Sequence, residues 1–333
     1  MRQALKRSCL VALLLLGSAV AALAQSRDPD AARIVTDDID RFWGAFDRAA
    51  PELPAQPFEA GYLAPGTTGL KDFVALRIGG AEELAKTLRA HPKYYRSIRE
   101  STQRIRTMEP GIRASFYALK YLYPDAVFPD VYFLIGRLTS GGTVSSHGLL
   151  IGAEMNGRTP QAPMEELSDW LRQVIKPVDQ IPHIVAHELI HFQQKYPDAK
   201  TLLGQAIREG SADFLAELIS GSHGNQHIHE FADPREAELW AEFQRKMHGK
   251  DFAGWLYSDV EGRPHDLGYW MGYKITKSYY DRAGDKRQAI REILGIQDFD
   301  AFLAKSGYAE RFATPVGVND LPDLPGRLRS GPL

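Results

Sequence analysis

Apolar residues recur at helical spacing near the start of the chain. The positions i, i+3, i+4 and i+7 of one helix face are occupied by Ile39, Phe42, Trp43 and Phe46. We expect a helix over residues 28–50, with Thr36 as a cap and acidic residues following it in the first turn. This aromatic stripe is typical of a face that packs into a core. Four prolines and three glycines within 51–69 then predict a loop.

The pattern changes from helical to extended after Tyr123-Pro124. Helical stretches are expected near residues 81–90, 94–108 and 112–122. The runs 127–138 and 144–153 are rich in Val, Ile, Leu and Phe, and they predict two strands joined by a turn at 140–142. An exposed edge strand here could pair with an extended peptide, whereas a buried structural hairpin is the alternative. His147 is interpreted as a polar turn residue on this hairpin.

Two further helices are expected in the second half of the chain. The first runs over residues 181–196, with Asp179 and Pro182 at its start and Pro197 at its end. The second spans about 202–218 and has an apolar face. A His-containing loop over 221–233, a helix starting at Asp233-Pro234, and a loop followed by a helix over 263–282 are expected after these. Together the elements predict a mainly helical α+β fold.

The first of these two helices carries H-E-x-x-H, from His187 to His191. Residues four apart share one helix face, so both imidazoles can reach a single metal ion. Glu188 can then reach a water bound to that ion, which makes a nucleophile at neutral pH. The competing interpretation is two surface histidines beside a solvated glutamate. The motif predicts a zinc site with His187 and His191 as ligands and Glu188 as the general base.

A third ligand is expected from the second helix, because catalytic zinc usually has three protein ligands. Glu209 follows His191 by 18 residues, which leaves room for a turn and a returning helix. Asp213 lies four residues after Glu209 and is placed to accept an N–H from a ligand histidine. Both could instead be ordinary surface carboxylates. Glu217, on the same face, is a competing ligand that lacks the small neighbours of Glu209.

H-E-x-x-H followed by E-x-x-x-D resembles the gluzincins, the zinc peptidases of the thermolysin-like superfamily. The resemblance implies a zincin-like fold, with a small sheet preceding the H-E-x-x-H helix and a helix carrying the third ligand. It implies Zn²⁺ ligands His187, His191 and Glu209, with Glu188 as general base. Asp213 matches the residue that orients a ligand histidine.

A broader resemblance covers residues 34–312. Its motifs are F-W-G-A-F-D at 42–47, Y-F-L-I-G-R at 132–137, S-G-G-T at 140–143, E-G-S-A-D at 209–213 and G-Y-W-M-G-Y at 268–273. The chain is similar to a bacterial family of secreted predicted zinc-dependent proteases, related to gliding-motility lipoproteins. We therefore expect a single metallopeptidase-like domain over 27–312, made of a helical part (27–125) and a part holding the hairpin and zinc-site helices (126–312).

Amide hydrolysis also needs a group that stabilises the negative oxygen of the tetrahedral intermediate. Tyr269 is the first candidate and His265 the second, since gluzincins use a tyrosine or a histidine for this purpose. The glycines flanking Tyr269 would allow close backbone approach, although Tyr269 could equally be a packing residue. His223, His227 and His229 form a second histidine-rich segment, which we interpret as a solvated loop because the main site already has three ligands.

The N-terminal segment indicates where in the cell the protein is located. Arg2, Lys6 and Arg7, the apolar run 10–20 and Ala22-Leu23-Ala24 have the form of a signal peptide over 1–24; a retained membrane anchor is the alternative. Cleavage removes three positive charges and no negative ones, which takes the net charge from −2 to −5 and suggests no nucleic-acid partner. Cys9, the one cysteine, precedes the apolar run, so we expect neither lipidation there nor a disulfide in the mature protein.

The sequence thus predicts a secreted or periplasmic zinc metallopeptidase that hydrolyses peptide bonds through a zinc-activated water. No membrane span is expected after signal cleavage, and the tail 313–333 is expected to be disordered. Two alternatives stay open: a non-catalytic, zinc-stabilised envelope or motility-related binding protein, and a zinc amidase acting on cell-wall fragments. The side-chain preference, the choice between endopeptidase and exopeptidase, and the oligomeric state also stay open.

Overall fold

The structure contains a four-stranded sheet, in the spatial order β1-β2-β4-β3. This computed structural model describes residues 26–257 and 260–313. The strands are β1 (Ile34–Val35), β2 (Asp130–Leu134), β3 (Gly142–Ser145) and β4 (Gly148–Gly152). Strand β2 runs parallel to β1 and β4, whereas β3 runs antiparallel to β4. Strand β3 is therefore an edge strand.

Helices make up most of the described chain. Those of the N-terminal half are α1 (Asp37–Ala49), α2 (Ala55–Phe58), α3 (Thr68–Phe73), α4 (Ala81–Ala90), α5 (Pro92–Ser97), α6 (Arg99–Gln103) and α7 (Glu109–Leu122). Those that follow the sheet are α8 (Asp169–Val174), α9 (Ile181–Gln193), α10 (Leu202–Ser220), α11 (Gln226–Ala232), α12 (Glu236–Lys246), α13 (Leu267–Arg282), α14 (Lys286–Leu294) and α15 (Phe299–Ser306). The prediction of a mainly helical α+β fold is confirmed.

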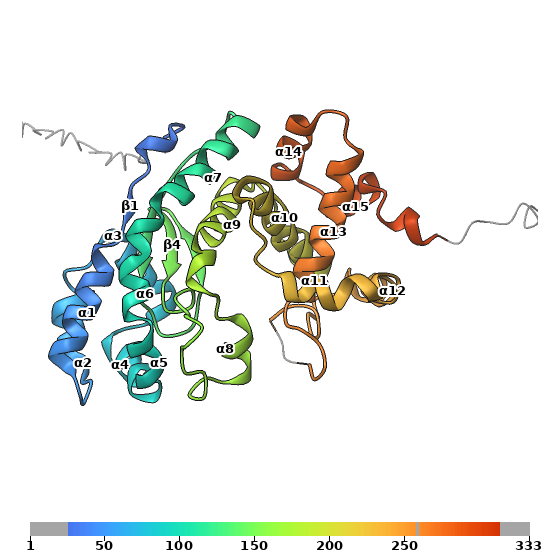
Figure 1. The fold of residues 1–333 in the computed structure, drawn as a ribbon. Coiled ribbons are helices and arrows are strands. Elements are labelled where there is room, and N and C mark those ends of the chain that lie inside the picture. The colour runs from blue at the N-terminus through green and yellow to red at the C-terminus, as the bar shows by residue number, and fades with distance from the viewer. Residues whose placement is uncertain (1–25, 258–259, 314–333) are drawn as a thin grey trace, which may run out of the picture.

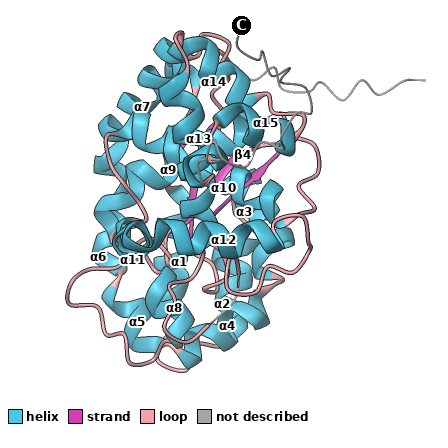
Figure 2. Ribbon diagram, turned by 90° about the vertical axis from the view of Figure 1, so that its right-hand side faces the viewer, coloured by secondary structure: helices cyan, strands magenta, loops and turns pink. Residues whose placement is uncertain are grey.

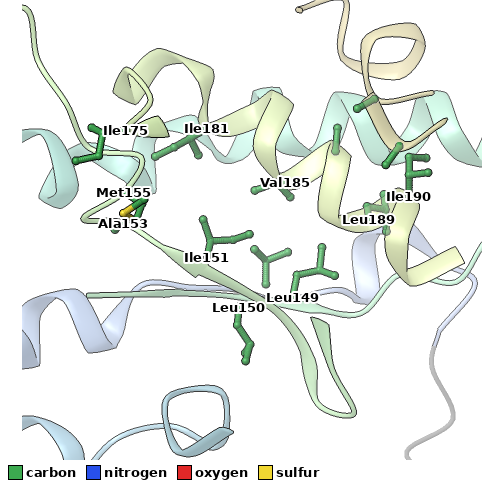
Figure 3. Packing of buried hydrophobic residues seen from close by; sticks show 14 of the residues in the cluster. Leu149, Leu150, Ile151, Ala153, Met155, Ile175, Ile181, Val185, Leu189 and Ile190 are labelled. Atoms are coloured by element: carbon green, nitrogen blue, oxygen red, sulfur yellow. The ribbon is translucent and has the colours of Figure 1, made fainter. Parts of the chain in front are cut away.

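The sheet is covered on both faces, which explains why every residue of β4 is buried. Leu149 and Ile151 point toward Val185 and Leu189 of α9, and Leu150 points to the opposite side (Figure 3). On that opposite side α1 and α3 pack against the sheet. A strand buried on both faces has a continuous apolar run instead of an alternating one, and L-L-I is such a run.

The order of the elements in space follows the order of the chain. Helices α1 and α3 lie on one face of the sheet and α9 on the other, α7 packs beside α9 and α10, and α11 to α15 lie on the far side of α10 (Figure 1). Viewed from the side, the few strands are enclosed by helices (Figure 2). Within residues 26–257 and 260–313, no helix is both long enough and apolar enough to cross a membrane.

The N-terminal segment differs from its prediction in two places. Residues 34–35 form β1 instead of continuing a helix, and α1 begins at Asp37 after Thr36, whose side chain makes no capping hydrogen bond. The aromatic stripe of α1 is buried, as predicted. The expected loop at 51–69 contains α2 and a π-helical turn at Glu59–Leu63, because Phe58 and Tyr62 are buried in the core.

The expected helix over 94–108 is also different. It is divided into α5, α6 and a 3₁₀ turn over Arg104–Met108, with non-helical backbone at Ile98 between α5 and α6. The side chain of Ile98, at this break, is buried in the core.

The predicted hairpin was wrong in its pairing. The run 144–153 contains two strands, β3 and β4, with the turn between them at residues 146–147, and β2 pairs with β4 in parallel. Gly142, expected in the turn, is the first residue of the edge strand. His147 lies in the real turn, where its Nδ1 is 2.7 Å from Oδ2 of Asp72.

Helices α9 and α10 occupy the predicted stretches with small changes at their ends. Helix α9 has Pro182 in its first turn but begins after Gln180 and ends at Gln193, since Asp179 belongs to a preceding 3₁₀ turn. Thr201 caps α10 by accepting from the N–H of Gly204. The predicted signal peptide (1–24) and the predicted tail (313–333), apart from Ala313, lie outside the described residues, and the single-domain boundaries stay a prediction.

Candidate metal centre and its surrounding cleft

The two histidines of H-E-x-x-H project from one face of α9. The rings of His187 and His191 lie edge to face, with centroids 4.6 Å apart. Leu189 and Ile190 are fully buried, so the apolar residues within the motif hold the helix against its neighbours while the histidines face away. Helical spacing thus brings the two imidazoles together, as the sequence predicts.

Helix α10 brings Glu209 to the same point. Its Oε2 lies 3.1 Å from Nε2 of His191 and 3.7 Å from Nε2 of His187. Within the described residues, these three side chains form the one group of His, Cys, Asp or Glu whose ligand atoms lie within 4.8 Å of one another in a geometry that could hold a metal ion. Glu217, the competing ligand, instead accepts a 2.7 Å hydrogen bond from the Tyr273 hydroxyl.

Close helix packing fixes the position of Glu209. A side chain at Gly210 would overlap backbone atoms of Gly272 and Tyr273, and one at Gly272 would overlap the backbone of Ala206. Helices α10 and α13 therefore meet main chain to main chain, which only glycine permits. This contact lies one residue away from Glu209 and limits how far its backbone can move.

Each histidine is also held through its second ring nitrogen. Nδ1 of His187 lies 2.8 Å from Oδ1 of Asp213, as the spacing predicts, and the side-chain amide of Asn225 donates to the other oxygen of Asp213 at 2.6 Å. Nδ1 of His191 lies 2.8 Å from Oε1 of Gln194. These contacts leave both Nε2 atoms directed toward Glu209, the arrangement in which outer partners orient metal-binding imidazoles.

Gln194 and Asn225 were not found from the sequence. Gln194 lies three residues after His191 and donates to the Arg208 carbonyl and the Ser211 hydroxyl, so it joins α9 to α10. Its helical spacing from His191 was a usable signal. Asn225 precedes α11 and is far from the motif in sequence, so its role depends on the tertiary fold.

The charges of the site favour a cation. Burial alone would lower the pKa of His187, but Asp213 and Glu209 outweigh it, and the pKa is raised well above its ordinary value. Burial likewise opposes ionisation of Glu209, yet His191 and His187 hold the pKa of that carboxyl well below its usual range. Carboxylates that favour an imidazolium ion also favour a divalent cation between the same atoms. Two neutral imidazoles and one carboxylate form a donor set suited to Zn²⁺.

Glu188 lies beneath the edge strand. A Cβ atom on Gly142 would overlap the carboxylate of Glu188, so the backbone of β3 passes directly over this side chain. Burial raises the pKa of Glu188, although His191 and His187 oppose the shift. A buried carboxylate with a raised pKa, next to the candidate ligands, has the placement and basicity expected of a general base.

The two predicted oxyanion candidates both line the cleft, and a third residue joins them. The ring of Tyr269 stacks on His187, with centroids 6.1 Å apart and an interplanar angle of 14°. His265 is buried in the cleft wall. Tyr257, which was not found from the sequence, is 59% exposed as a whole residue but interacts with Glu209. Desolvation of its hydroxyl, followed by Glu209 and Asp266, raises its pKa. Its backbone has a positive φ of 56°, an uncommon conformation for a tyrosine.

The histidine-rich segment differs from its prediction as a solvated loop. His227 and His229 lie on α11, and His229 is buried. The ring of His229 packs against His223 (centroids 4.3 Å apart) and against Tyr273 (4.7 Å). Burial lowers the pKa of His229 to about 4, which keeps the ring neutral. His223 and His229 therefore form an aromatic cluster with Tyr273 of α13. His227 lines the cleft.

Comparison with known families identifies the chain. The sequence model of the gliding motility protein GldB matches residues 76–248, slightly more than half of the chain. The protein belongs to the GldB family. The matched region includes the edge strand, α9 and α10, and thus every candidate metal ligand together with Glu188 and Asp213.

The family assignment confirms the predicted relationship to gliding-motility proteins, over a shorter range than the 34–312 expected. The GldB-family match ends before His265 and Tyr269. The family is one of lipoproteins, which agrees with a location in the cell envelope. Comparisons with curated proteins and with solved structures each found no match.

Proposed function

We propose that this protein is a secreted zinc-dependent peptidase of gluzincin type. The observation that carries the proposal is the convergence of His187 and His191 of α9 with Glu209 of α10, with Glu188 beside them beneath the edge strand. A structural metal site needs no general base, whereas a hydrolytic one does. Glu188 is therefore the residue that favours catalysis over a purely structural role.

The chemistry divides between the bound ion and the protein. Zn²⁺ held by His187, His191 and Glu209 would polarise water and the substrate carbonyl. Glu188 accepts a proton from the attacking water and passes it to the nitrogen of the leaving amine. Asp213 and Gln194 hold the two imidazoles in the orientation that directs Nε2 toward the ion.

Strand β3 supports a binding mode for an extended substrate. It pairs with β4 along one edge, and its backbone lies over Glu188. A peptide that pairs with the other edge of β3 would be held by main-chain hydrogen bonds, independent of its side chains. Its scissile bond would then lie close to Glu188. This arrangement favours a peptide as the substrate over a small cell-wall amide.

Tyr257 and Tyr269 are the candidates for stabilising the developing negative charge on the substrate oxygen, with His265 third. Both tyrosines are protonated at neutral pH, since a tyrosine hydroxyl ordinarily titrates at about pH 10. Desolvation of the hydroxyls and the carboxylates of Glu209 and Asp266 raise the pKa of each further. A protonated hydroxyl near Glu209 can donate a hydrogen bond where that charge forms. The interaction of Tyr257 with Glu209 and its strained backbone favour Tyr257.

The family relationship favours a second candidate function. A zinc-stabilised envelope protein that binds a partner of a motility apparatus would suit a member of the GldB family. In that case the ion would only hold α9 and α10 together, and Glu188 would not act as a general base.

Cleavage of a mixed peptide library separates the two functions. The zinc-loaded protein should cleave library members, a chelator should stop cleavage, and added zinc should restore it. The matched control is Glu188→Gln, which removes the base while keeping the side-chain volume. We expect this variant to retain zinc and lose at least about 10²-fold in rate. Undiminished cleavage by the variant would exclude Glu188 as the base, and an intact library with the wild-type protein would favour the binding function.

A further inference from the structure

A cavity of about 310 Å³ opens beside the candidate metal centre. His187, Glu188 and Tyr269 are among the residues that line it. Its apolar walls are supplied by Met155, Trp170, Val174, Ile184 and Ile228. A cavity of this size can accept one large side chain. Its position next to Glu188 makes it a site for the substrate residue beside the scissile bond, an assignment that rests on the proposed function.

The cavity also contains the side chain of Lys176, on the segment between α8 and α9. The backbone of Lys176 is anchored by its N–H, which donates to the Met155 carbonyl at 2.8 Å. The ammonium group donates to the Gly224 carbonyl at 3.3 Å and to Oδ1 of Asn225 at 2.9 Å. An ammonium group has three N–H bonds, so these two contacts leave one for a ligand.

The ammonium of Lys176 has only neutral partners. Both of its acceptors are uncharged amide oxygens, and no carboxylate of the described residues lies within 4.0 Å of it. Burial lowers the pKa of Lys176, and the carboxylates of Asp213 and Asp266 oppose that shift. Asp213 is engaged by His187 and Asn225, and Asp266 accepts the backbone N–H of Tyr257. A part-buried cation without a paired anion is costly, and an anionic ligand would relieve that cost.

A chain of hydrogen bonds joins Lys176 to the metal centre. It runs from Nζ of Lys176 to Asn225, from Asn225 to Asp213, and from Asp213 to Nδ1 of His187. The ammonium is therefore three hydrogen-bond links from a candidate zinc ligand, and both residues line the same cavity. A ligand group bound by Lys176 and a carbonyl at the metal can belong to one substrate molecule.

We propose that Lys176 is a specificity-determining residue that binds a carboxylate of the peptide substrate. The carboxylate could be the side chain of Asp or Glu next to the scissile bond, or the C-terminal carboxylate of the peptide. The first source makes the protein an endopeptidase with an acidic preference, and the second makes it a carboxypeptidase. Both sources share the same chemistry: an anion that forms a charge-assisted hydrogen bond with a largely desolvated ammonium.

Binding of three small probes tests the proposal without hydrolysis. The probes are N-acetylglutamate amidated at its α-carboxyl (side-chain carboxylate only), N-acetylglutamine (α-carboxylate only) and N-acetylglutaminamide (neither). They are titrated calorimetrically into zinc-loaded Glu188→Gln protein. We expect at least one anionic probe to bind about tenfold or more tightly than the neutral one, and the probe that binds identifies the source of the carboxylate.

Substitution of Lys176 decides whether this residue is responsible. Lys176→Met should abolish the preference, Lys176→Arg should retain it, and Lys86→Met, at an exposed position on α4, should leave it unchanged. Zinc content and thermal unfolding show that each variant is folded. A preference that persists in Lys176→Met would mean that the metal binds the carboxylate, and it would overturn the proposal, as would equal binding of all three probes.

Hydrolysis is measured separately. If the peptidase proposal holds, Lys176→Met should lower kcat/KM about tenfold or more for peptides with the preferred carboxylate, and leave it unchanged for their amide counterparts. If no peptide is cleaved but the anionic probe still binds through Lys176, the peptidase proposal fails and carboxylate recognition remains.

Discussion

Nδ1 of His187 and Oδ1 of Asp213 lie 2.8 Å apart, and the second carboxylate oxygen accepts from Asn225. The imidazole of His187 can therefore neither turn nor change the nitrogen that it offers to a metal. Replacing Asp213 by Ala removes this constraint, so zinc affinity should fall about 10- to 100-fold. Asp213→Asn, which retains an acceptor oxygen, should lose less. A competition titration with a zinc chelator measures both, and Asp198→Ala, at an exposed position, is the control.

Glu209 and Glu217 lie two helical turns apart on α10 and should respond differently to substitution. Glu209→Ala removes a direct ligand and should weaken zinc binding by about 100-fold or more, more than the loss of an outer partner. Glu217→Ala removes a hydrogen bond from Tyr273 and a 4.0 Å contact with His223, neither of which involves the metal ligands, so it should retain full zinc content. Elemental analysis after dialysis distinguishes the variants. Stoichiometric zinc in Glu209→Ala would show that another residue completes the site.

Gly142 and Gly141 form a matched pair for testing the position of Glu188. A methyl group at Gly142 would overlap the Glu188 carboxylate, whereas one at Gly141 would meet only Asn156 and Met155, at 3.4 Å or more. Gly142→Ala should therefore lower kcat by about 10²-fold, because small displacements of a catalytic group are costly. Gly141→Ala should behave like the wild-type protein. Equal activity of the two variants would show that the close approach of β3 to Glu188 is not needed for catalysis.

Tyr257 and Tyr269 compete for one role, and removal of each hydroxyl should distinguish them. We expect Tyr257→Phe to lower kcat about 10²- to 10³-fold with little change in KM, as removal of a transition-state donor does. Tyr269→Phe keeps the ring that stacks on His187, so its effect should be smaller. Steady-state kinetics on a peptide substrate gives the comparison. The reverse order of effects would assign the role to Tyr269.

Glu154 should make stability depend on pH. Its carboxylate is buried and accepts the backbone N–H groups of Gly136 and Leu138 at 2.8 and 3.2 Å. Burial raises its pKa from 4.5 to about 7, although these hydrogen bonds oppose the shift. The folded protein thus holds this proton more tightly than the unfolded chain. The stability that results is fully present below pH 4.5 and is lost as the pH rises to about 7.

The loss from Glu154 should amount to about 3 kcal/mol. Urea unfolding at pH 4.5 and pH 7.5 measures it. Glu154→Gln should have a smaller difference between the two pH values, and Glu52→Gln, at an exposed position, should keep the wild-type difference. If Glu154→Gln retains the full difference, the pH dependence has another origin.

Local patterns predicted the site better than they predicted the sheet. The spacing within α9 and between Glu209 and Asp213 depends only on helix geometry, so these residues could be placed from the sequence. Strand β2 pairs with β4 instead of with β3, which follows it in the sequence. The pattern of apolar residues alone could not show that the run after residue 140 holds two strands instead of one. Asn225, Tyr257 and Lys176 reach the cleft from loops, where no repeating pattern indicates the direction of a side chain.

The crossing of α10 and α13 at Gly210 and Gly272 limits how the cleft could open. Main-chain atoms in direct contact have no side chains between them that could rearrange, so we expect these two helices to move as a rigid unit. Glu209 belongs to α10 and Tyr269 to α13. Any widening of the cleft between these two helices and α9 would therefore move Glu209 and Tyr269 together relative to His187 and His191.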